Sequence, residues 1–326
     1  MEEQGMFANR VDLSALQQSV EEVRIEVRKL IVGQEKMVQL MIAAILADGH
    51  ILLEGVPGVA KTLAAKLLAR TFKANFSRIQ FTPDLMPSDV VGTSIFNAKA
   101  GNFEFRQGPV FSNLVLIDEI NRAPAKTQSA LFEVMEERQV TVDGTTYQME
   151  EPFMVIATQN PIEQEGTYQL PEAQLDRFLF KIDVGYPTLE EEKLILAEFH
   201  ARKNRNDLSV VKQILDQKKI AAYRQTVSMI HIGDELLDYI ARITDLSRNH
   251  SSLFLGGSPR ASLAIMTSAK AFAALSGRDF VTPDDIKNVV TPVLRHRIQL
   301  TPEREMEGMT TDGAISQIIE TVEVPR

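Results

Sequence analysis

A short glycine-rich segment that ends in Lys61 and Thr62 carries the residue types that bind phosphate. It follows the apolar run Ile51 to Leu53, which predicts a buried strand, and beyond Lys61 the apolar residues recur at helical spacing. A strand, a glycine turn and Lys-Thr at the start of a helix are the arrangement of a phosphate-binding loop. Glycine lets backbone N–H groups converge on an anion, and a helix N-terminus adds free N–H donors. We therefore expect a nucleotide to be held by Gly55, Val56, Pro57, Gly58, Val59, Ala60, Lys61 and Thr62.

Lys61 is informative because a cation in the first turn of a helix opposes the helix dipole. A polyphosphate between the two would relieve this opposition, and the Thr62 hydroxyl would then be a ligand for Mg²⁺. The strict pattern has glycine before the lysine, whereas this chain has Ala60. We expect the loop to keep its shape if Ala60 retains a helical φ. The alternative is an ordinary strand–turn–helix with a solvated lysine.

Two adjacent acids follow a second apolar run. Leu114 to Ile117 predicts a fully buried central strand, and Asp118 and Glu119 come at its carboxyl end. Open α/β sheets bind their ligands at that end of the strands. Asp118 can organise the coordination shell of Mg²⁺, and Glu119 can orient and polarise an attacking water. The alternative is a solvated strand end.

The elements that must position these residues alternate along the first half of the chain. Strands are expected at residues 51–53, 76–81, 113–119, 153–157 and 178–184. Because helical segments separate them, they predict a mostly parallel α/β sheet. Two hairpins are expected within this half, at residues 94–106 and 138–149, and Asp143-Gly144 in the second is typical of a type I′ turn.

A boundary is expected near Gly185 to Thr188, beyond which nearly every segment has a helical pattern. The predicted domains are residues 1–186, an αβα nucleotide-binding domain, and residues 187–326, an all-helical domain. Two helix starts are marked by a capping residue followed by proline, at Ser258-Pro259 and Thr282-Pro283. The expected helices of this half are 189–203, 218–229, 233–248, 259–276 and 283–297.

The composition of the 326 residues excludes several classes of protein. There is no cysteine, so disulfides and thiolate metal sites are excluded. The net charge of −9, from 35 basic and 44 acidic residues, argues against broad nucleic-acid binding. The start, Met1 to Gly5, lacks the basic and apolar parts of a signal peptide, and no apolar run approaches the ~20 residues that span a bilayer. We expect a cytoplasmic protein without a membrane segment.

Several long motifs resemble the MoxR family of AAA+ ATPases. Gly55 to Thr62 resembles the Walker A motif of AAA+ proteins, and Leu114 to Glu119 resembles Walker B. The MoxR family is also marked by an alanine at the position of Ala60. The segments that resemble this family most closely are Asp118 to Pro124, Ala157 to Pro161 and Leu170 to Phe178. The resemblance implies an αβα P-loop core with a five-stranded parallel sheet, followed by a helical lid domain.

The resemblance also implies roles for single residues. Asn160 resembles sensor 1, Arg177 resembles the arginine finger that reaches a neighbouring subunit's nucleotide, and Arg260 resembles sensor 2. The alternative for Asn160 is a turn asparagine before Pro161. For Arg177 it is an ion pair with Asp176, and for Arg260 it is a solvated side chain. For Arg260 the sequence adds an argument, because the first turn of a helix opposes a cation that has no phosphate partner.

Two further segments carry resemblances. Val32 and Gly33 lie in the Ile31 to Gln34 segment, which resembles the one that lines the adenine pocket. Hairpin 94–106 resembles the helix-2 insert and hairpin 138–149 the hairpin before sensor 1, and the alternative for both is a plain surface hairpin. Arg122 stays unassigned as a second catalytic arginine.

The function implied is Mg²⁺-dependent ATP hydrolysis by a homo-oligomer, expected to be a hexameric ring. It would act as a chaperone that remodels a protein client or inserts its metal cofactor, with a von Willebrand factor A domain protein as partner.

One rival is a nucleic-acid motor, which requires basic hairpin tips. Another is a nucleotide-dependent switch without hydrolysis, against which Glu119 and Arg177 argue. A small-molecule kinase would leave Arg177 and Arg260 unexplained. The sequence does not specify the client, the pathway, the ring size or the nucleotide state.

Overall fold

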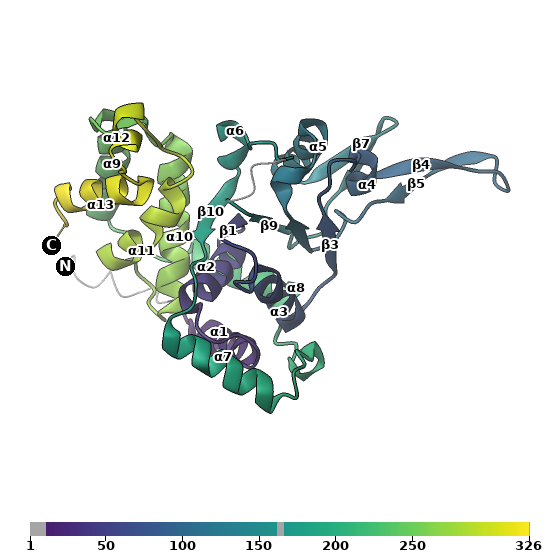
Figure 1. Cartoon of the computed structure of the whole chain (residues 1–326), viewed down its shortest axis with the longest axis horizontal. Coiled ribbons are helices and arrows are strands. Elements are labelled where there is room, and N and C mark those ends of the chain that lie inside the picture. The colour runs from purple at the N-terminus through teal and green to yellow at the C-terminus, as the bar shows by residue number, and fades with distance from the viewer. Residues whose placement is uncertain (1–10, 162–165, 326) are drawn as a thin grey trace, which may run out of the picture. The chain divides into compact units, whose positions relative to one another are not determined.

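The computed structural model describes residues 11–161 and 166–325, so the segment Met1 to Gly5 lies outside the described residues. Its central feature is a five-stranded sheet in the order β10-β1-β9-β6-β3 (Figure 1). Every neighbouring pair is parallel. The strands are β1 (His50–Glu54), β3 (Phe76–Gln80), β6 (Leu114–Asp118), β9 (Met154–Gln159) and β10 (Phe178–Asp183). The predicted five-stranded parallel sheet is therefore confirmed.

The register of the sheet brings several polar strand ends to one edge. Gln80 of β3 pairs with Asp118 of β6, and Leu53 of β1 pairs with Thr158 of β9. Because parallel strands all end at the same edge, residues far apart in sequence meet there.

Helices cover both faces of this sheet, and the side chains of β6 point alternately to one face and the other. Val115 and Ile117 join a buried cluster with α4 (Pro87–Val91) and α5 (Ala125–Glu137). The next residue, Asp118, instead reaches a side chain of α3 (Lys61–Thr71), because successive residues of a strand point to opposite faces. The sheet thus lies between helices, which is the αβα arrangement that the sequence predicted.

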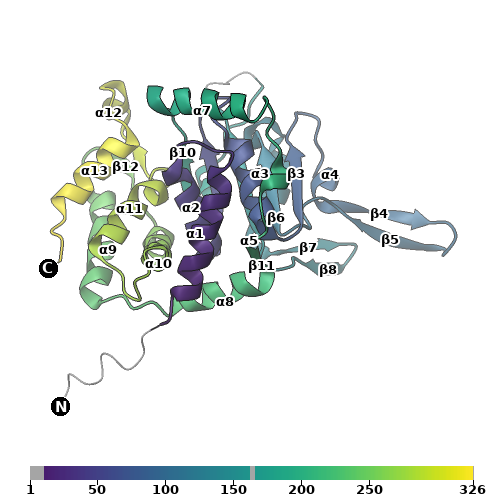
Figure 2. The same cartoon turned by 90° about the horizontal axis from the view of Figure 1, so that it is seen from below.

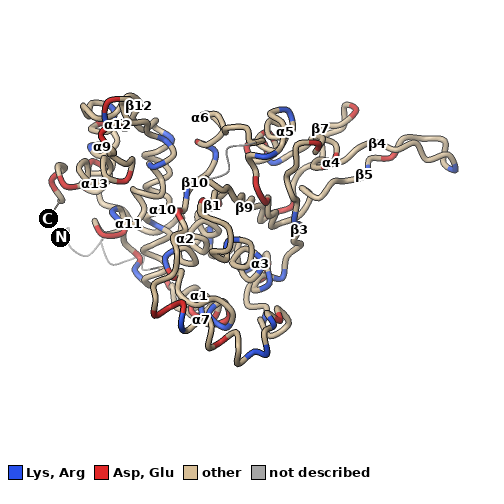
Figure 3. Tube along the Cα trace, in the orientation of Figure 1, with Lys and Arg blue, Asp and Glu red and all other residues tan. Residues whose placement is uncertain are grey.

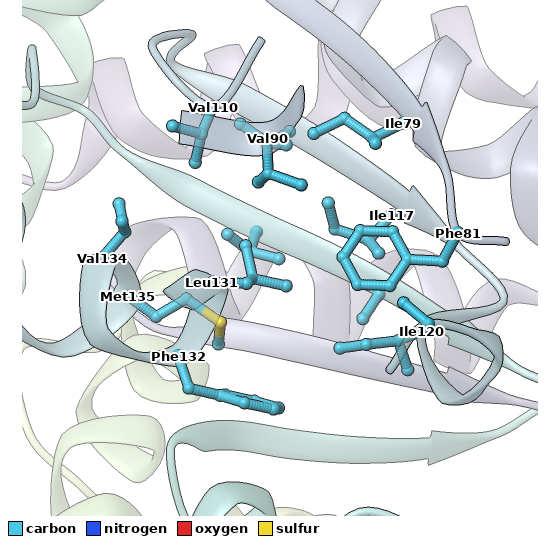
Figure 4. Close-up of a cluster of buried hydrophobic side chains, with 14 of the residues drawn as sticks. Ile79, Phe81, Val90, Val110, Ile117, Ile120, Leu131, Phe132, Val134 and Met135 are labelled. Atoms are coloured by element: carbon cyan, nitrogen blue, oxygen red, sulfur yellow. The ribbon is translucent and has the colours of Figure 1, made fainter. Parts of the chain in front are cut away.

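The core between β3, β6 and α5 is densely apolar (Figure 4). Phe81, Ile117 and Leu131 are completely buried and lie close together in this cluster. Burying a side chain of this size stabilises the fold by roughly 1.5–3 kcal/mol. The cluster therefore anchors the strand ends that carry the polar residues.

Two hairpins interrupt the alternation of strands and helices, as the sequence predicted. The first consists of β4 (Gly92–Asn97) and β5 (Asn102–Gln107), and the second of β7 (Gln139–Val142) and β8 (Thr145–Gln148). Asp143 and Gly144 have φ of 51° and 77°, which matches the predicted type I′ turn. Both views show β4–β5 as a long ribbon that extends away from the sheet (Figures 1 and 2).

The helices before β1 are α1 (Ser14–Arg28) and α2 (Glu35–Leu46), and those just after β10 are α7 (Leu189–Ala201) and α8 (Gln217–Ser228). The other short elements are α6 (Glu172–Leu175), the 3-10 turns η1 (Ile120–Arg122) and η2 (Leu208–Val210), and the parallel pair β2 (Phe72–Lys73) and β11 (Leu215–Asp216). The predicted helices at 189–203 and 218–229 are confirmed within a few residues.

The C-terminal region is helical. Its elements are α9 (Asp234–Asn249), α10 (Pro259–Leu275), α11 (Pro283–Leu294), α12 (Pro302–Met306), α13 (Thr311–Thr321) and the antiparallel pair β12 (Leu253–Leu255) and β13 (Gln299–Leu300). Helix α11 starts at the predicted Thr282-Pro283, and its start is a capping box in which Thr282 and Asp285 bond each other's backbone. Helix α13 is not among the predicted helices, because Gly313 weakens its helical pattern and burial of Ala314, Ile315 and Ile318 stabilises it instead.

The chain forms two compact units whose limits differ from the boundary expected after residue 186. One unit contains residues 23–41 and 48–221, and therefore the sheet, both hairpins and α7. The other contains residues 42–47 and the helical region from Ala222 onward, together with the described residues up to Glu22. Within the described residues, no helix has the length and apolar character needed to cross a membrane.

Candidate active site

The phosphate loop lies between β1 and α3 and takes its shape from positions that suit glycine. A Cβ at Gly55 would approach the Val184 carbonyl oxygen to 2.5 Å, closer than side chains tolerate. Gly58 has φ of 92°, in the region that L residues with side chains avoid. The loop then turns directly into α3, whose first residues are Lys61 and Thr62.

Ala60 differs from the expectation drawn from the sequence. Its φ is 63° and its ψ is 17°, so it adopts the left-handed and not the right-handed helical conformation. The condition set from the sequence, a right-handed helical φ at Ala60, is therefore not met, although the loop still leads directly into α3. Alanine occupies this conformation at a cost of roughly 1–2 kcal/mol, which glycine would not incur.

The Lys61 ammonium group is held at the mouth of the loop. It donates to the carbonyl oxygen of Gln159 at 2.9 Å and to that of Gly55. These two carbonyls come from β9 and from the start of the loop, so the lysine links the two sides of the site. A cation so placed near the N-terminus of a helix is suited to an anionic ligand.

Asp118 is almost fully buried, with 5% of its surface exposed. Its Oδ1 accepts hydrogen bonds from Thr62 Oγ1 at 3.1 Å and from Thr158 Oγ1 at 3.3 Å. Its Oδ2 accepts a hydrogen bond from Arg78 Nε at 2.6 Å. The structure thus joins the loop threonine to the acid of β6, as a shared role in metal binding requires.

Glu119 lies at the turn after β6, with φ of 58°. Its Oε2 accepts from Gln80 Nε2 at 2.7 Å and from Arg122 at 3.0 Å. Its backbone N–H donates to Thr158 Oγ1 at 3.1 Å. Both the side chain and the backbone of Glu119 are therefore held by neighbouring strand ends, which fixes where the carboxylate points.

These residues line one cavity of about 400 Å³. Its walls come from the phosphate loop, the ends of β3, β6 and β9, and the first turn of α3. The lining residues are Pro57, Gly58, Ala60, Lys61, Thr62, Leu63, Arg78, Gln80, Asp118, Glu119, Thr158, Gln159 and Asn160. The structure thus brings Asn160, which is 7% exposed, to the same cavity as the loop and both acids.

Sequence reasoning missed five of these lining residues: Leu63, Arg78, Gln80, Thr158 and Gln159. Arg78 and Gln80 are alternate residues of β3, so both side chains point to the same face of the sheet, where Arg78 reaches Asp118 and Gln80 reaches Glu119. The alternation of polar and apolar residues from Phe76 to Phe81 is visible in the sequence. The sequence does not show that β6 is the neighbour of β3, because the two strands pair only in the tertiary structure.

Arg177 does not line this cavity. It lies between α6 and β10 and pairs with Glu136 of α5, with 2.7 Å between the two groups. The structure therefore shows a partner for Arg177 that differs from Asp176, the neighbour considered from the sequence.

Val32, Gly33 and Arg260 are likewise not among the residues that line the cavity. Val32 and Gly33 come just before α2, and Gly33 has φ of 68°. Gly33 has little space, because a Cβ there would approach Glu191 of α7 to 2.4 Å. Arg260 is exposed in the first turn of α10, as predicted, and belongs to the helical unit.

The donor atoms near Asp118 suit Mg²⁺. Thr62 Oγ1 and Asp118 Oδ1 are hard oxygen donors, and the 3.1 Å between them allows both to bind one ion. Among the described residues, no cluster of three or more His, Cys, Asp or Glu side chains could hold a metal. Mg²⁺ needs no such cluster where substrate phosphates and water complete its shell.

Comparison with known proteins identifies the class. A model of the ATPase family associated with various cellular activities (AAA) matches residues 50–180, and an AAA lid domain model matches residues 245–318. A crystal structure of a "putative ATPase" from Cytophaga hutchinsonii has a TM-score of 0.87 and 44% identity, over 96% of this chain and 97% of that one. Together with the parallel sheet and the phosphate loop, these matches define an AAA+ ATPase with a helical lid domain.

Two relatives specify the family. Chaperone MoxR1 of Mycobacterium tuberculosis is 44% identical over 323 residues, which cover 96% of this chain and 84% of that protein. The uncharacterized protein YeaC of Bacillus subtilis is 47% identical over 299 residues, which cover 92% of each chain. This chain belongs to the MoxR family of AAA+ ATPases.

Proposed function

We propose that this chain hydrolyses ATP in a Mg²⁺-dependent reaction and uses that reaction, as an oligomer, to remodel or mature a protein client. One observation carries the proposal. Lys61, Thr62, Asp118 and Glu119 line a single cavity, so groups that bind phosphate, ligate a metal and activate water lie together.

Each residue has a distinct task in the proposed reaction. Lys61 and the backbone N–H groups of the loop bind the phosphates, and Thr62 and Asp118 hold Mg²⁺. Mg²⁺, when bound, supplies charge neutralisation to the phosphate oxygens. Glu119 orients a water and accepts its proton at the carboxylate, and Asn160 positions that water. The bonds that Glu119 receives from Gln80 and Arg122 hold its carboxylate at the cavity wall.

We propose that the site is completed by a neighbouring subunit and by the lid. Arg177 of the neighbour and Arg260 of the lid domain stabilise charge on the transferring phosphoryl group, and Val32 and Gly33 contact the adenine. An arginine supplied in trans increases such a rate by about 10³–10⁵-fold. An isolated subunit is therefore a poor ATPase, and a hexameric ring in the cytoplasm is the proposed active form.

The proposed client is a protein. The name of the relative Chaperone MoxR1 supports this class of client. The family resemblance adds a von Willebrand factor A domain protein as partner, and metal-cofactor insertion as one form of client maturation. A nucleic-acid motor is disfavoured, because Lys99 and Arg106 are the basic residues of hairpin 94–106 and Arg138 is the one of hairpin 138–149. Figure 3 shows few charged residues along β4–β5.

The test is ATP hydrolysis per subunit over a range of protein concentrations, with Mg²⁺ present. We expect specific activity to rise steeply with concentration, and Glu119→Gln to lower turnover by at least about a hundredfold at every concentration. Activity that is independent of concentration but still requires Glu119 would contradict the shared site. Binding of ATP without turnover at any concentration would instead favour a nucleotide-dependent switch.

A further inference from the structure

The carboxylate of Asp118, a proposed ligand of Mg²⁺, already pairs with a cationic side chain of the same chain, Arg78. Oδ2 of Asp118 accepts from Nε of Arg78 at 2.6 Å, whereas Oδ1 accepts from two threonine hydroxyls. The threonine bonds leave the negative charge in place, and the guanidinium compensates it. A nearly buried carboxylate requires such compensation, because an unpaired charge away from water is costly.

The two partners differ strongly in exposure. The side chain of Asp118 is 7% exposed and that of Arg78 is 46% exposed. Arg78 can therefore leave Asp118 for water at low cost, whereas Asp118 cannot follow.

Arg78 also lines the cavity that contains Lys61 and Thr62. A guanidinium released from Asp118 there would have the oxygens of a polyphosphate as alternative partners, and Arg pairs well with phosphate. The same side chain thus has two possible anionic partners, one when the metal is absent and one when metal and nucleotide are present.

We propose that Arg78 is an internal counter-cation of Asp118, which Mg²⁺ must displace when it enters with a nucleotide. Arg78 is a positioning residue: it keeps the carboxylate compensated and oriented until the metal replaces it. This inference rests on the proposed Mg²⁺ site of Thr62 and Asp118. It predicts that removing Arg78 makes metal binding easier and metal-free nucleotide binding weaker.

The experiment compares the full-length chain with Arg78→Gln, using a fluorescent ADP analogue titrated in EDTA and at a series of Mg²⁺ concentrations. We expect the half-saturating Mg²⁺ concentration for nucleotide binding to fall by about threefold to tenfold, since a partly exposed ion pair no longer competes. In EDTA we expect a higher Kd for the analogue. Electron paramagnetic resonance of Mn²⁺ with ADP measures the metal directly and should show the same shift.

Two variants serve as controls. Arg70→Gln removes the same charge from an exposed position in the last turn of α3, away from Asp118, and should leave the Mg²⁺ dependence unchanged. Arg78→Lys keeps a cation and should fall between the wild type and Arg78→Gln. Thermal unfolding in EDTA checks that each variant is folded.

The outcomes separate this proposal from the proposed function. If the wild type responds to Mg²⁺ but Arg78→Gln has an equal or higher half-saturating concentration, the counter-cation role is overturned and the metal site stands. If nucleotide binding by the wild type shows no response to Mg²⁺, the metal site is overturned and the role of Arg78 with it. A shift of equal size in Arg70→Gln would assign the effect to net charge and overturn the proposal.

Discussion

At the scale of single residues, the site depends on features that are energetically unfavourable by themselves, namely a buried charge and a left-handed backbone conformation. Asp118 is buried and is compensated by Arg78, and Glu119 has a left-handed φ and is held by Gln80 and Arg122. Such features are retained where the surrounding structure holds them in place. Here the surrounding structure is the set of strand ends around the cavity.

Ala60 gives a prediction at this scale. Because its φ is 63°, Ala60→Gly relieves roughly 1–2 kcal/mol of backbone strain and loses roughly 0.5–1 kcal/mol through the freer unfolded chain. We expect a net gain of about 0.5–1 kcal/mol in the free energy of unfolding, measured by denaturant unfolding. The matched control is Ala197→Gly at an exposed position within α7, which should lose about 1 kcal/mol. A loss of stability in both variants would mean that Ala60 is not strained.

At the scale of elements, the two hairpins form one braced structure. The ring of Phe105 on β5 lies with its centroid 4.4 Å from that of Tyr147 on β8, and 5.8 Å from that of Phe111. Ser94 of β4 also donates to Asp143 in the turn of the second hairpin. The long ribbon β4–β5 is thus held near its base by the hairpin that leads into β9, the strand of Thr158.

Removing the aromatic contact should loosen the longer hairpin. Tyr147→Ala deletes a ring pair worth about 0.5–1.5 kcal/mol, so we expect amide hydrogen exchange in β4 and β5 to accelerate by about twofold to tenfold. Hydrogen exchange read by mass spectrometry measures this. Thr146→Ala is the control, because Thr146 is the adjacent, exposed residue and bonds to Thr141 on β7. Equal acceleration in both variants would show that the ring contact does not brace the ribbon.

At the scale of the whole molecule, the question is whether Arg177 acts in the site of its own subunit or in a site shared with a neighbouring subunit. It lies outside the cavity lining and pairs with Glu136, so a role in hydrolysis requires a second subunit or a movement within the first. These two explanations predict different behaviour in mixed assemblies.

Subunit mixing tests this directly. Glu119→Gln and Arg177→Ala should each be nearly inactive alone, because each lacks one part of every site. When they are mixed, an interface that combines the intact Glu119 of one subunit with the intact Arg177 of its neighbour should regain activity, measured as ATP turnover. Absence of recovery from assemblies shown to be mixed would place Arg177 in its own subunit's site. Glu136→Gln, which breaks the ion pair but keeps the arginine, controls for a purely structural role of Arg177.

The sequence by itself determined the local features of this protein. The phosphate loop, the acidic strand end, the parallel sheet and most helix bounds follow from residue types and spacing within short windows. Those windows contain the periodicity and the capping residues that decide local structure. For the same reason the hairpin turn at Asp143-Gly144 could be predicted with its backbone conformation.

Tertiary structure decided which residues meet. Arg78 and Asp118 are 40 residues apart, and they pair because β3 lies beside β6. The pairing of Arg177 with Glu136 and the helix at residues 311–321 likewise depend on the packing of distant segments. A single sequence does not record strand order or register, so the counter-cation at the metal site becomes visible only once the sheet is assembled.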